Sequence, residues 1–480
     1  MDDGNIIESI RHRATLPLHE LFNYRGQNTY FRPLLTVSYL FDAWLWDLKP
    51  AAMHLVNILL HVCNASLVYL CLRQFFSGHD KTIRIPPLTG AMLFLVHPIN
   101  TESINWISGR TDPLAALFCL LATVLIVKLA RDNSSRPSIA WTAALLLLTG
   151  SLVKEVAVAL FPASIVFLVI YRPVQFDREA LPWLWRLKLT IPFLLGLTGY
   201  FLLRTSALQH LDRGLAIVVE QPQTGSYIRN FSEILTAAGF YGKKLLLPQP
   251  LSFSIDSVSP AYFWLGIALL IMSLAVLCKR NLQSFLVLCL SFAVAPALLN
   301  AALKIAWTPY AERYLYLPSA FFCMILTLTI YSSAKSTSRV RLLAVLVLLL
   351  SFLPTTINRN LLWGDPLQLI ETTHKENPGN PTVWTMYATA LANRGHYQLA
   401  RTEYQQILNL HPRHLFTYEA MAQMELYIDS VWSAHKTLEP FYSESLVPNQ
   451  AIRKIMQEVE MRTATGKDSL GTQTGAVQRP

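Results

Sequence analysis

The chain has 480 residues, of which 52% are hydrophobic and only 15% are charged, and its mean hydropathy is +0.34. Soluble domains carry roughly 25% charged residues, so the composition excludes a purely soluble protein and predicts an integral membrane protein with a soluble appendage. The net charge is +10, but the basic residues are scattered in short loops beside apolar runs, where they set membrane orientation. We therefore expect a lipid bilayer as partner, and no nucleic acid.

The first segment, 1–53, is mixed and polar, and it shows no cleavable signal peptide. It opens with the carboxylate pair Asp2 and Asp3 and later carries Arg32. The chain enters its first apolar run near His54. A carboxylate in such a segment is placed to take a proton from a hydroxyl group just outside the bilayer. We interpret 1–53 as an outer loop with an acidic pair.

Apolar runs follow one another along 54–357, and each crosses or nearly crosses a hydrocarbon core of ~30 Å. They cover 54–74, 88–99, 113–130, 138–153, 155–171, 187–204, 261–278, 282–302, 316–332 and 340–357. The stretch 231–247 contains Lys243 and Lys244 and is followed by Pro248, so we expect an interfacial or re-entrant helix there. The sequence predicts an all-α, polytopic membrane domain over 54–357 with about ten spans.

Lysine and arginine occur in alternate loops, after the first, third, fifth, seventh and ninth runs. The positive-inside rule places these loops in the cytoplasm. The loops 1–53, 98–112, 154–155, 205–260 and 303–315, and everything after 358, then face outward. The six cysteines lie in or beside apolar runs without a CxxC pattern, so we expect neither disulfides nor metal ligation from them.

Ionisable side chains gather in three of the short outward segments. Such groups are costly at membrane depth and by default mark a functional site. They are His97, Glu102, Arg110 and Asp112 in the first segment, Lys154 and Glu155 in the second, and Glu312, Arg313 and Tyr314 in the third. Arginine forks suit phosphate recognition, so together with Arg32 these residues form a candidate donor- and acceptor-binding set. The alternative is a purely structural ion pair between helices, such as Glu102 with Arg110.

From Pro381 onward the composition becomes that of a soluble helical domain. The positions typical of a tetratricopeptide repeat are occupied by Trp384, Ala388, Leu391, Gly395, Tyr397, Ala400, Tyr404, Leu410 and Pro412. A half repeat precedes this unit and a weaker repeat follows it. We therefore predict a C-terminal α-solenoid over 358–448, suited to a protein partner, and a short helix with a disordered tail over 449–480.

Several of these motifs together resemble the bacterial relatives of the transmembrane and tetratricopeptide-repeat O-mannosyltransferases, within the GT-C superfamily. The resemblance rests on DDGNIIESI, YFRPLLTVSYLFDAWLWDLKPAAMHLVNILLH, HPINTESINWISGRTDPLAALF, Lys154-Glu155, AERYLYLPS and the closing repeats, in that order. The family places a membrane span before the acidic pair, and we expect that this first span is missing here. The repeat array is also shorter than is common in the family.

The resemblance implies inverting transfer of a monosaccharide, with mannose a candidate, from a polyprenyl-phosphate donor to a hydroxyl acceptor. It implies an inner-membrane enzyme acting on the periplasmic side, where the repeats would lie, with protein Ser or Thr or a glycan as acceptor. It maps the catalytic carboxylates onto Asp2 and Asp3, of which Asp3 is preferred. Arg110, Lys154 and Arg313 become candidates to hold the donor phosphate or to offset the charge of the leaving group.

No cofactor is indicated and no metal site is recognisable in the sequence, although a requirement for a divalent metal stays open. Two other functions remain in view. One is a non-catalytic, membrane-anchored repeat scaffold for envelope glycan assembly. The other is a transporter or polymerase of lipid-linked glycans, which would usually show internal duplication of its spans.

Overall fold

The structure is a computed structural model that describes residues 10–11, 31–76, 85–131, 137–170, 183–208, 227–304, 306, 308–332, 337–442 and 450–464. It forms two compact units, a membrane unit within 2–361 and a C-terminal unit within 362–480. Within the described ranges the β pairing is a single bridge between Ile255 and Tyr310, and the rest of the regular structure is helical.

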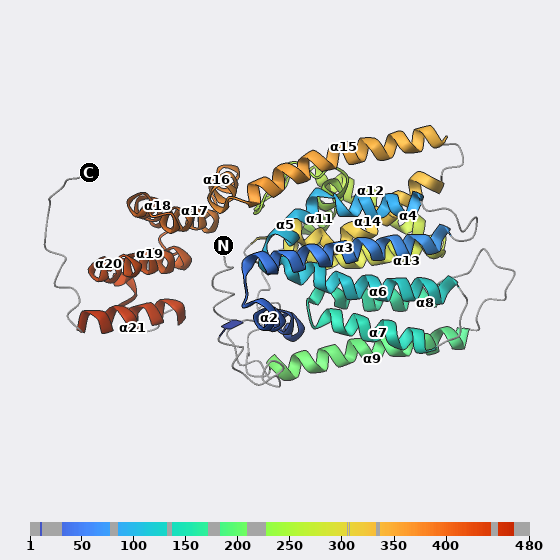
Figure 1. Ribbon diagram of the computed structural model, residues 1–480, viewed down its shortest axis with the longest axis horizontal. Coiled ribbons are helices and arrows are strands. Elements are labelled where there is room, and N and C mark those ends of the chain that lie inside the picture. The colour runs from blue at the N-terminus through green and yellow to red at the C-terminus, as the bar shows by residue number, and fades with distance from the viewer. Residues whose placement is uncertain are drawn as a thin grey trace. The chain divides into compact units, whose positions relative to one another are not determined.

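The described part of the membrane unit consists almost entirely of helices (Figure 1). Its first half contains α2 (Pro33–Trp46), α3 (Pro50–Phe76), α4 (Ile85–Leu95), α5 (Thr101–Asn105), α6 (Thr111–Arg131), α7 (Pro137–Ser151), α8 (Leu160–Ile170) and α9 (Trp183–Leu208). Its second half contains α11 (Tyr227–Leu246), α12 (Tyr262–Cys278), α13 (Leu282–Leu303), α14 (Tyr316–Ser332) and α15 (Ser338–Trp363). Short 3-10 turns are η2 (Pro98–Asn100), η3 (Ile107–Arg110), η4 (Glu155–Ala159) and η5 (Glu312–Leu315).

Six helices of the described chain are long and apolar enough to cross a membrane, and four shorter helices are also apolar. Each predicted apolar run coincides with one of them. The expected all-α, polytopic membrane protein is therefore confirmed. The helix α11 is 20 residues long but is not among the membrane-spanning candidates. That agrees with the expectation that 231–247 makes no net crossing, which stays a prediction.

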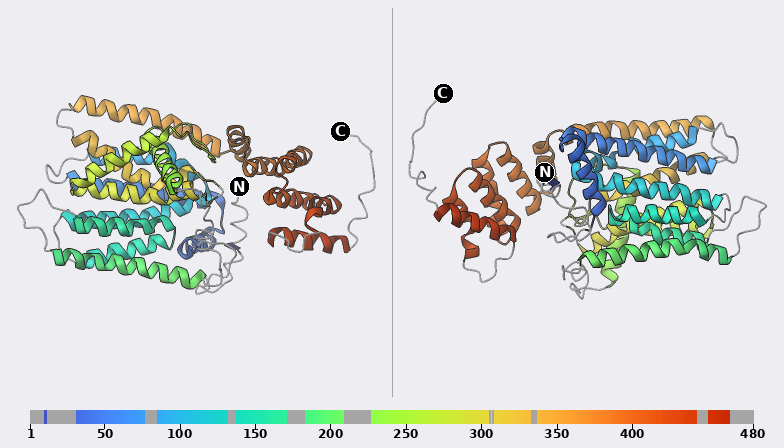
Figure 2. Two further views of the ribbon diagram at one scale, coloured as in Figure 1. Left: turned by 180° about the vertical axis from the view of Figure 1, so that it is seen from behind. Right: turned by 60° about the horizontal axis from the view of Figure 1, so that its bottom comes forward.

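The helices of the membrane unit run side by side (Figures 1 and 2), with α3 against α4 and α6, α6 against α7, and α7 and α8 against α9. Buried apolar side chains of α3, α4, α6, α7, α8, α13 and α14 form one continuous core. Large apolar side chains elsewhere are exposed, among them Trp264 and Leu350 at 72% and 70%. Exposed apolar surface of this extent is what a bilayer covers.

The helices α11 and α12 approach each other through two glycines. A Cβ atom added at Gly239 would overlap the carbonyl oxygen of Tyr262, and one added at Gly266 would overlap the carbonyl oxygen of Leu235. The backbones are therefore closer than any larger residue allows. Small residues permit such contacts between membrane helices, and here they hold α11 against the bundle.

Helix termini bring the short outward segments together at one end of the membrane unit. At this end α3, α6, α8 and α14 begin, and α4, α7, α9 and α15 end. Prolines help to set these starts: Pro33 opens α2, Pro98 opens η2, and Pro113 lies in the first turn of α6. Proline favours a first helical turn because its missing N–H would have no partner there.

The C-terminal unit contains α16 (Pro366–Glu376), α17 (Pro381–Asn393), α18 (Tyr397–Leu410), α19 (Leu415–Tyr427), α20 (Val431–Tyr442) and α21 (Gln450–Ala464). Gly395 has a φ of 83° in the turn between α17 and α18, a left-handed conformation that favours glycine. Ala388, Ala400 and Tyr404 are fully buried between these helices. Four of the positions on which the predicted repeat rests thus lie at its turn and in its packed interior, whereas Leu410 is 66% exposed.

Candidate functional site

Charged side chains from distant parts of the sequence form a polar layer at the end of the membrane unit described above. Its members are Arg32, Asp42, Glu102, Arg110, Asp112, Lys154, Glu155, Arg204, Lys244, Glu312, Arg313 and Arg359. Most of them are joined in ion pairs. Buried charges are stable only when they are paired and hydrogen-bonded, so the layer fixes the positions of its own members.

Arg110 is fully buried and is held by Asp42, which is only 1% exposed. Its Nε donates to Oδ1 of Asn57 at 3.0 Å and its Nη2 donates to the carbonyl oxygen of Met53 at 3.0 Å. The ring of Tyr39 lies 4.7 Å from the guanidinium. Every face of Arg110 is therefore in contact with protein, and its charge is neutralised inside the fold.

Glu102 pairs with Arg313, with 2.7 Å between Oε1 and Nη1. Its second oxygen, Oε2, accepts the backbone N–H of Arg313 at 3.2 Å. The guanidinium also donates to the Thr308 hydroxyl at 3.0 Å and lies over the rings of Trp106 and Tyr314. The proposed pair of Glu102 with Arg110 is therefore wrong, because Glu102 pairs with Arg313 and Arg110 with Asp42.

Lys154 and Asp112 form a third pair at 2.5 Å, with exposed side-chain fractions of 14% and 6%. Asp112 lies in the first turn of α6, where the helix dipole favours a negative charge. Burial lowers the pKa of Lys154, and the neighbouring Asp112 carboxylate opposes that change. Lys154 is thus already paired with Asp112, and it also interacts electrostatically with Arg32 and Arg313.

Glu155 forms ion pairs with two arginines in the more exposed part of the polar layer. Nη2 of Arg32 lies 2.7 Å from Oε2, and Nη1 of Arg204 lies 3.5 Å from Oε1. Arg204 also donates to the Tyr200 hydroxyl at 3.1 Å. The three charged side chains are 22 to 29% exposed. One carboxylate is thus shared by two arginines, and it holds both guanidinium groups in place.

Glu312 points away from the neighbouring Arg313 and pairs with Lys244 of α11 at 2.8 Å. The same Glu312 oxygen accepts the backbone N–H of Ser252 at 2.9 Å, and Lys244 donates to the carbonyl oxygen of Pro250. Both charged side chains are almost completely buried. This pair fixes the segment 250–252 and the end of α11 to the start of α14.

His97 supports the turn that precedes α5. Its Nδ1 accepts the backbone N–H of Ile99 at 3.3 Å, and its Nε2 lies 3.0 Å from the carbonyl oxygen of Leu245. Burial lowers the pKa of His97 to about 4, so the ring is neutral at physiological pH. These contacts indicate a role in positioning the loop.

The catalytic candidates Asp2 and Asp3 lie outside the described residues, so their roles stay predictions. Four charged members of the polar layer were absent from the predicted binding set: Asp42, Arg204, Lys244 and Arg359. Arg204 ends one apolar run, Arg359 follows another, and Lys244 lies in the stretch 231–247. At such positions a basic residue usually reports only membrane orientation. Among the described residues no group of three or more His, Cys, Asp or Glu is placed to hold a metal ion.

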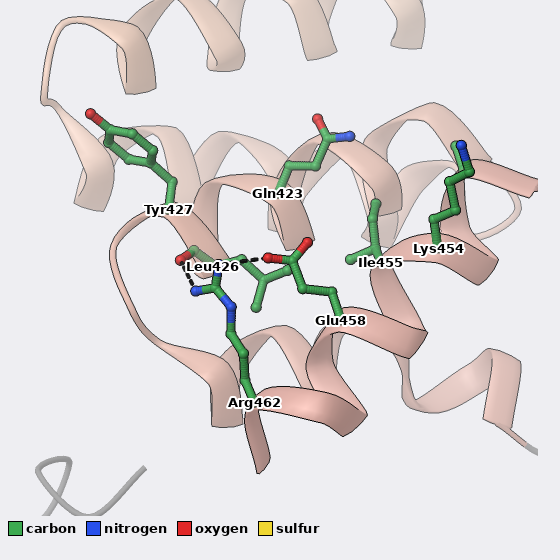
Figure 3. A pocket seen from close by; sticks show the side chains of 8 residues that line it. Gln423, Leu426, Tyr427, Lys454, Ile455, Glu458 and Arg462 are labelled. Atoms are coloured by element: carbon green, nitrogen blue, oxygen red, sulfur yellow. Dashed lines mark hydrogen bonds and ion pairs between the residues drawn. The ribbon is translucent and has the colours of Figure 1, made fainter. Parts of the chain in front are cut away.

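The C-terminal unit has a hollow of about 430 Å³ between α19 and α21 (Figure 3). Arg462 at its edge donates to the carbonyl oxygen of Leu426 at 3.1 Å and to Glu458 at 2.5 Å. Gln423 and Lys454 add polar groups to the lining. The hollow therefore combines an apolar floor with charged and amide groups, a combination suited to a polypeptide.

Similarity to known proteins extends along most of the chain. Protein O-mannosyl-transferase TMTC4 of Homo sapiens is 26% identical over 467 residues, covering 83% of this chain and 62% of that relative. TMTC3 of Mus musculus is 24% identical over 438 residues and TMTC1 of Homo sapiens 25% identical over 433 residues, each covering 80% of this chain. No family model matches the chain, and no solved structure matches it.

The chain spans 62%, 44% and 48% of the lengths of these three curated relatives. Each relative is named a protein O-mannosyl-transferase. The similarity covers about four-fifths of this chain, so it is not confined to the C-terminal helices. The resemblance inferred from the motifs is thereby confirmed, and the chain is a relative of the TMTC-type protein O-mannosyl-transferases.

Proposed function

We propose that this protein is a membrane glycosyltransferase that moves a monosaccharide, with mannose the first candidate, from a polyprenyl-phosphate donor to a hydroxyl group. The acceptor we propose is a Ser or Thr side chain of a protein. The observation that supports this most directly is the polar layer at one end of a bundle of apolar helices. A lipid-linked sugar needs both parts, because its tail partitions into lipid and its phosphate requires cations.

In the proposed reaction Asp3, or its neighbour Asp2, takes the proton of the acceptor hydroxyl as general base. The acceptor oxygen forms a bond to the anomeric carbon of the sugar while the bond from that carbon to the phosphate oxygen breaks. The electron pair of the broken bond leaves with the lipid phosphate. Cations held in place near the leaving oxygen stabilise its developing charge without further reorganisation.

We assign the donor side of the reaction to the more open cations of the polar layer. Arg32, Lys154 and Arg313 retain exposed fractions of 22%, 14% and 11%, respectively. Their carboxylate partners Glu155, Asp112 and Glu102 hold them in position. Arg110 is fully buried, so we propose that it stabilises the structure around this site and does not contact the substrate.

The remaining predicted residues support the same site. Glu312 is engaged by Lys244 and the Ser252 backbone, His97 is engaged by the backbone of its turn and of α11, and Tyr314 lies beside Arg313. We propose that they position the loops around the donor. We place this end of the bundle on the periplasmic side of the inner membrane, because the basic loops of the sequence belong to the opposite side.

We further propose that the helix pairs of the C-terminal unit form a short tetratricopeptide array on the same side of the membrane. The left-handed Gly395 and the buried Ala388 and Ala400 support this assignment. Such arrays bind other polypeptides along their surfaces. The hollow between α19 and α21 then offers a contact for an acceptor protein.

Transfer of radiolabelled mannose from polyprenyl-phosphate mannose to membrane proteins tests the proposal. The chain should support incorporation, and Asp3→Asn or Asp2→Asn should abolish or strongly reduce it. Asp47→Asn is a matched control, because the Asp47 side chain is 82% exposed at the end of α2. No transfer with any polyprenyl-phosphate sugar, together with an unchanged cellular phenotype of both variants, would favour the non-catalytic scaffold.

A further inference from the structure

Arg359 on α15 is buried within the membrane unit and forms no ion pair with any carboxylate among the described residues. Its exposed fraction is 6%, and its Nη1 donates weakly to the carbonyl oxygen of Leu251 at 3.4 Å. Its Nε and Nη2 have no hydrogen-bond partner in the part of the chain that the structure describes. A buried guanidinium without a partner is unfavourable by several kcal/mol, so two donors of Arg359 remain available to a ligand.

The charges around Arg359 leave it uncompensated. Glu102 interacts electrostatically with Arg359, but both oxygens of Glu102 are already engaged by Arg313. Glu312, which interacts with Glu102, is paired with Lys244. Within the described chain neither carboxylate forms an ion pair with Arg359, so the charge of Arg359 is left without a partner.

A second unpartnered donor lies in the same region. The indole Nε1 of Trp106 is buried and has no hydrogen-bond partner among the residues of the described ranges. The Trp106 ring packs against Phe253 with the centroids 6.0 Å apart. Arg359 contacts the same short segment through Leu251. The loop that carries Trp106 is also tied to α15, because Asn105 donates to Asn360 at 2.7 Å.

We propose that Arg359 and the indole N–H of Trp106 bind a phosphate group carried by a polyprenyl lipid. A guanidinium edge offers two parallel donors that match two oxygens of a phosphate, and the unpaired positive charge of Arg359 favours an anion. Arg359 lies near the end of a membrane-spanning candidate helix, the depth at which a lipid phosphate resides. The identity of the lipid rests on the proposed function, whereas the anion site rests on the geometry alone.

Binding of polyprenyl phosphate to the purified protein in neutral detergent tests this inference. The affinity should fall about 10- to 100-fold in Arg359→Gln, the loss expected for hydrogen bonds to a charged group. Arg359→Lys retains the positive charge but not the two parallel donors of the guanidinium, so its affinity should lie between those of the unaltered protein and Arg359→Gln. The matched control is Arg339→Gln, an exposed position on the same helix, which should bind as the unaltered protein does.

Two competition experiments show whether the bound phosphate group belongs to a polyprenyl lipid, to another lipid or to a free anion. Inorganic phosphate and phosphatidylglycerol should compete poorly with polyprenyl phosphate. Equal competition by inorganic phosphate would mean a free anion, and equal competition by phosphatidylglycerol would mean a general lipid contact. Either result would overturn the assignment to a polyprenyl lipid, and unchanged affinity in Arg359→Gln would overturn the site itself.

Thermal unfolding of the ligand-free protein gives an independent readout. Without an anion, Arg359→Gln should melt at the same or a higher temperature, because an unpaired buried charge is removed. A clear loss of stability without ligand would show that Arg359 is already paired in the fold, and the inference would fail. Binding through Arg359 in a protein that transfers no sugar would retain this inference and refute only the proposed reaction.

Discussion

Removing the carboxylate of Asp42 should destabilise the membrane unit strongly, because it leaves Arg110 buried without an anion. The Arg110 side chain is 0% exposed and that of Asp42 is 1% exposed. Breaking one partner of such a pair costs about 3–5 kcal/mol. The remaining hydrogen bonds of Arg110, to Asn57 and Met53, contribute only about 1 kcal/mol each. The loss of charge compensation therefore dominates.

The assay is the free energy of unfolding in detergent micelles for Asp42→Asn, Arg110→Gln and the double variant. Each single change leaves an uncompensated partner, whereas the double change leaves two neutral amides that can bond to each other. We expect the double variant to recover most of the loss and to retain polyprenyl-phosphate binding. A change below about 0.5 kcal/mol in Asp42→Asn, the range of ordinary surface substitutions, would refute the reasoning and return Arg110 to the donor site.

Three further outcomes follow from other parts of the molecule. Gly266→Ala should lower the free energy of unfolding by about 1–3 kcal/mol, because the added methyl group would overlap the backbone of Leu235. Gly199→Ala is the control, because the space around Gly199 is open, and it should not destabilise the protein when both variants are measured by thermal unfolding. The buried His97 is neutral, so the free energy of unfolding should fall by up to about 3 kcal/mol as the pH is lowered from 6.5 to 4, because the unfolded state then binds a proton that the folded state does not. Unfolding curves of His97→Gln should be less sensitive to acid. Equal acid sensitivity of the two proteins would contradict this. Lys375→Ala removes an exposed ion pair of α16 and should leave the melting temperature unchanged.

The helix α2 lies in the segment 1–53, for which hydropathy predicted no helix. Hydropathy alone predicted the apolar helices over 54–357, because each apolar run must satisfy its own backbone in lipid. Only their ends differ. The run expected over 88–99 ends as a helix at Leu95, followed by a turn at 96–97 before Pro98, because a residue before proline disfavours helical geometry. The run expected from 155 begins with a 3-10 turn before α8.

The short segments of the candidate site were also predictable, but the pairing of their charges was not. Glu102 is 211 residues from Arg313 in the sequence, and Arg110 is eight positions from Glu102 along the same short segment. Proximity in sequence favoured the wrong pair, because side-chain direction in the turns decides which charges meet. Lys244 shows the same limit: its pairing with Glu312 depends on how α11 packs.

The most direct test of the proposed activity uses the purified protein in liposomes with polyprenyl-phosphate mannose and a Ser- and Thr-containing peptide. We expect the amount of donor consumed to equal the amount of hexose gained by the peptide, with one hexose per modified peptide. We also expect Asp3→Asn to abolish both donor consumption and hexose gain, while Asp47→Asn leaves both intact. Donor that stays unconsumed, or is consumed equally by Asp3→Asn, would contradict the account.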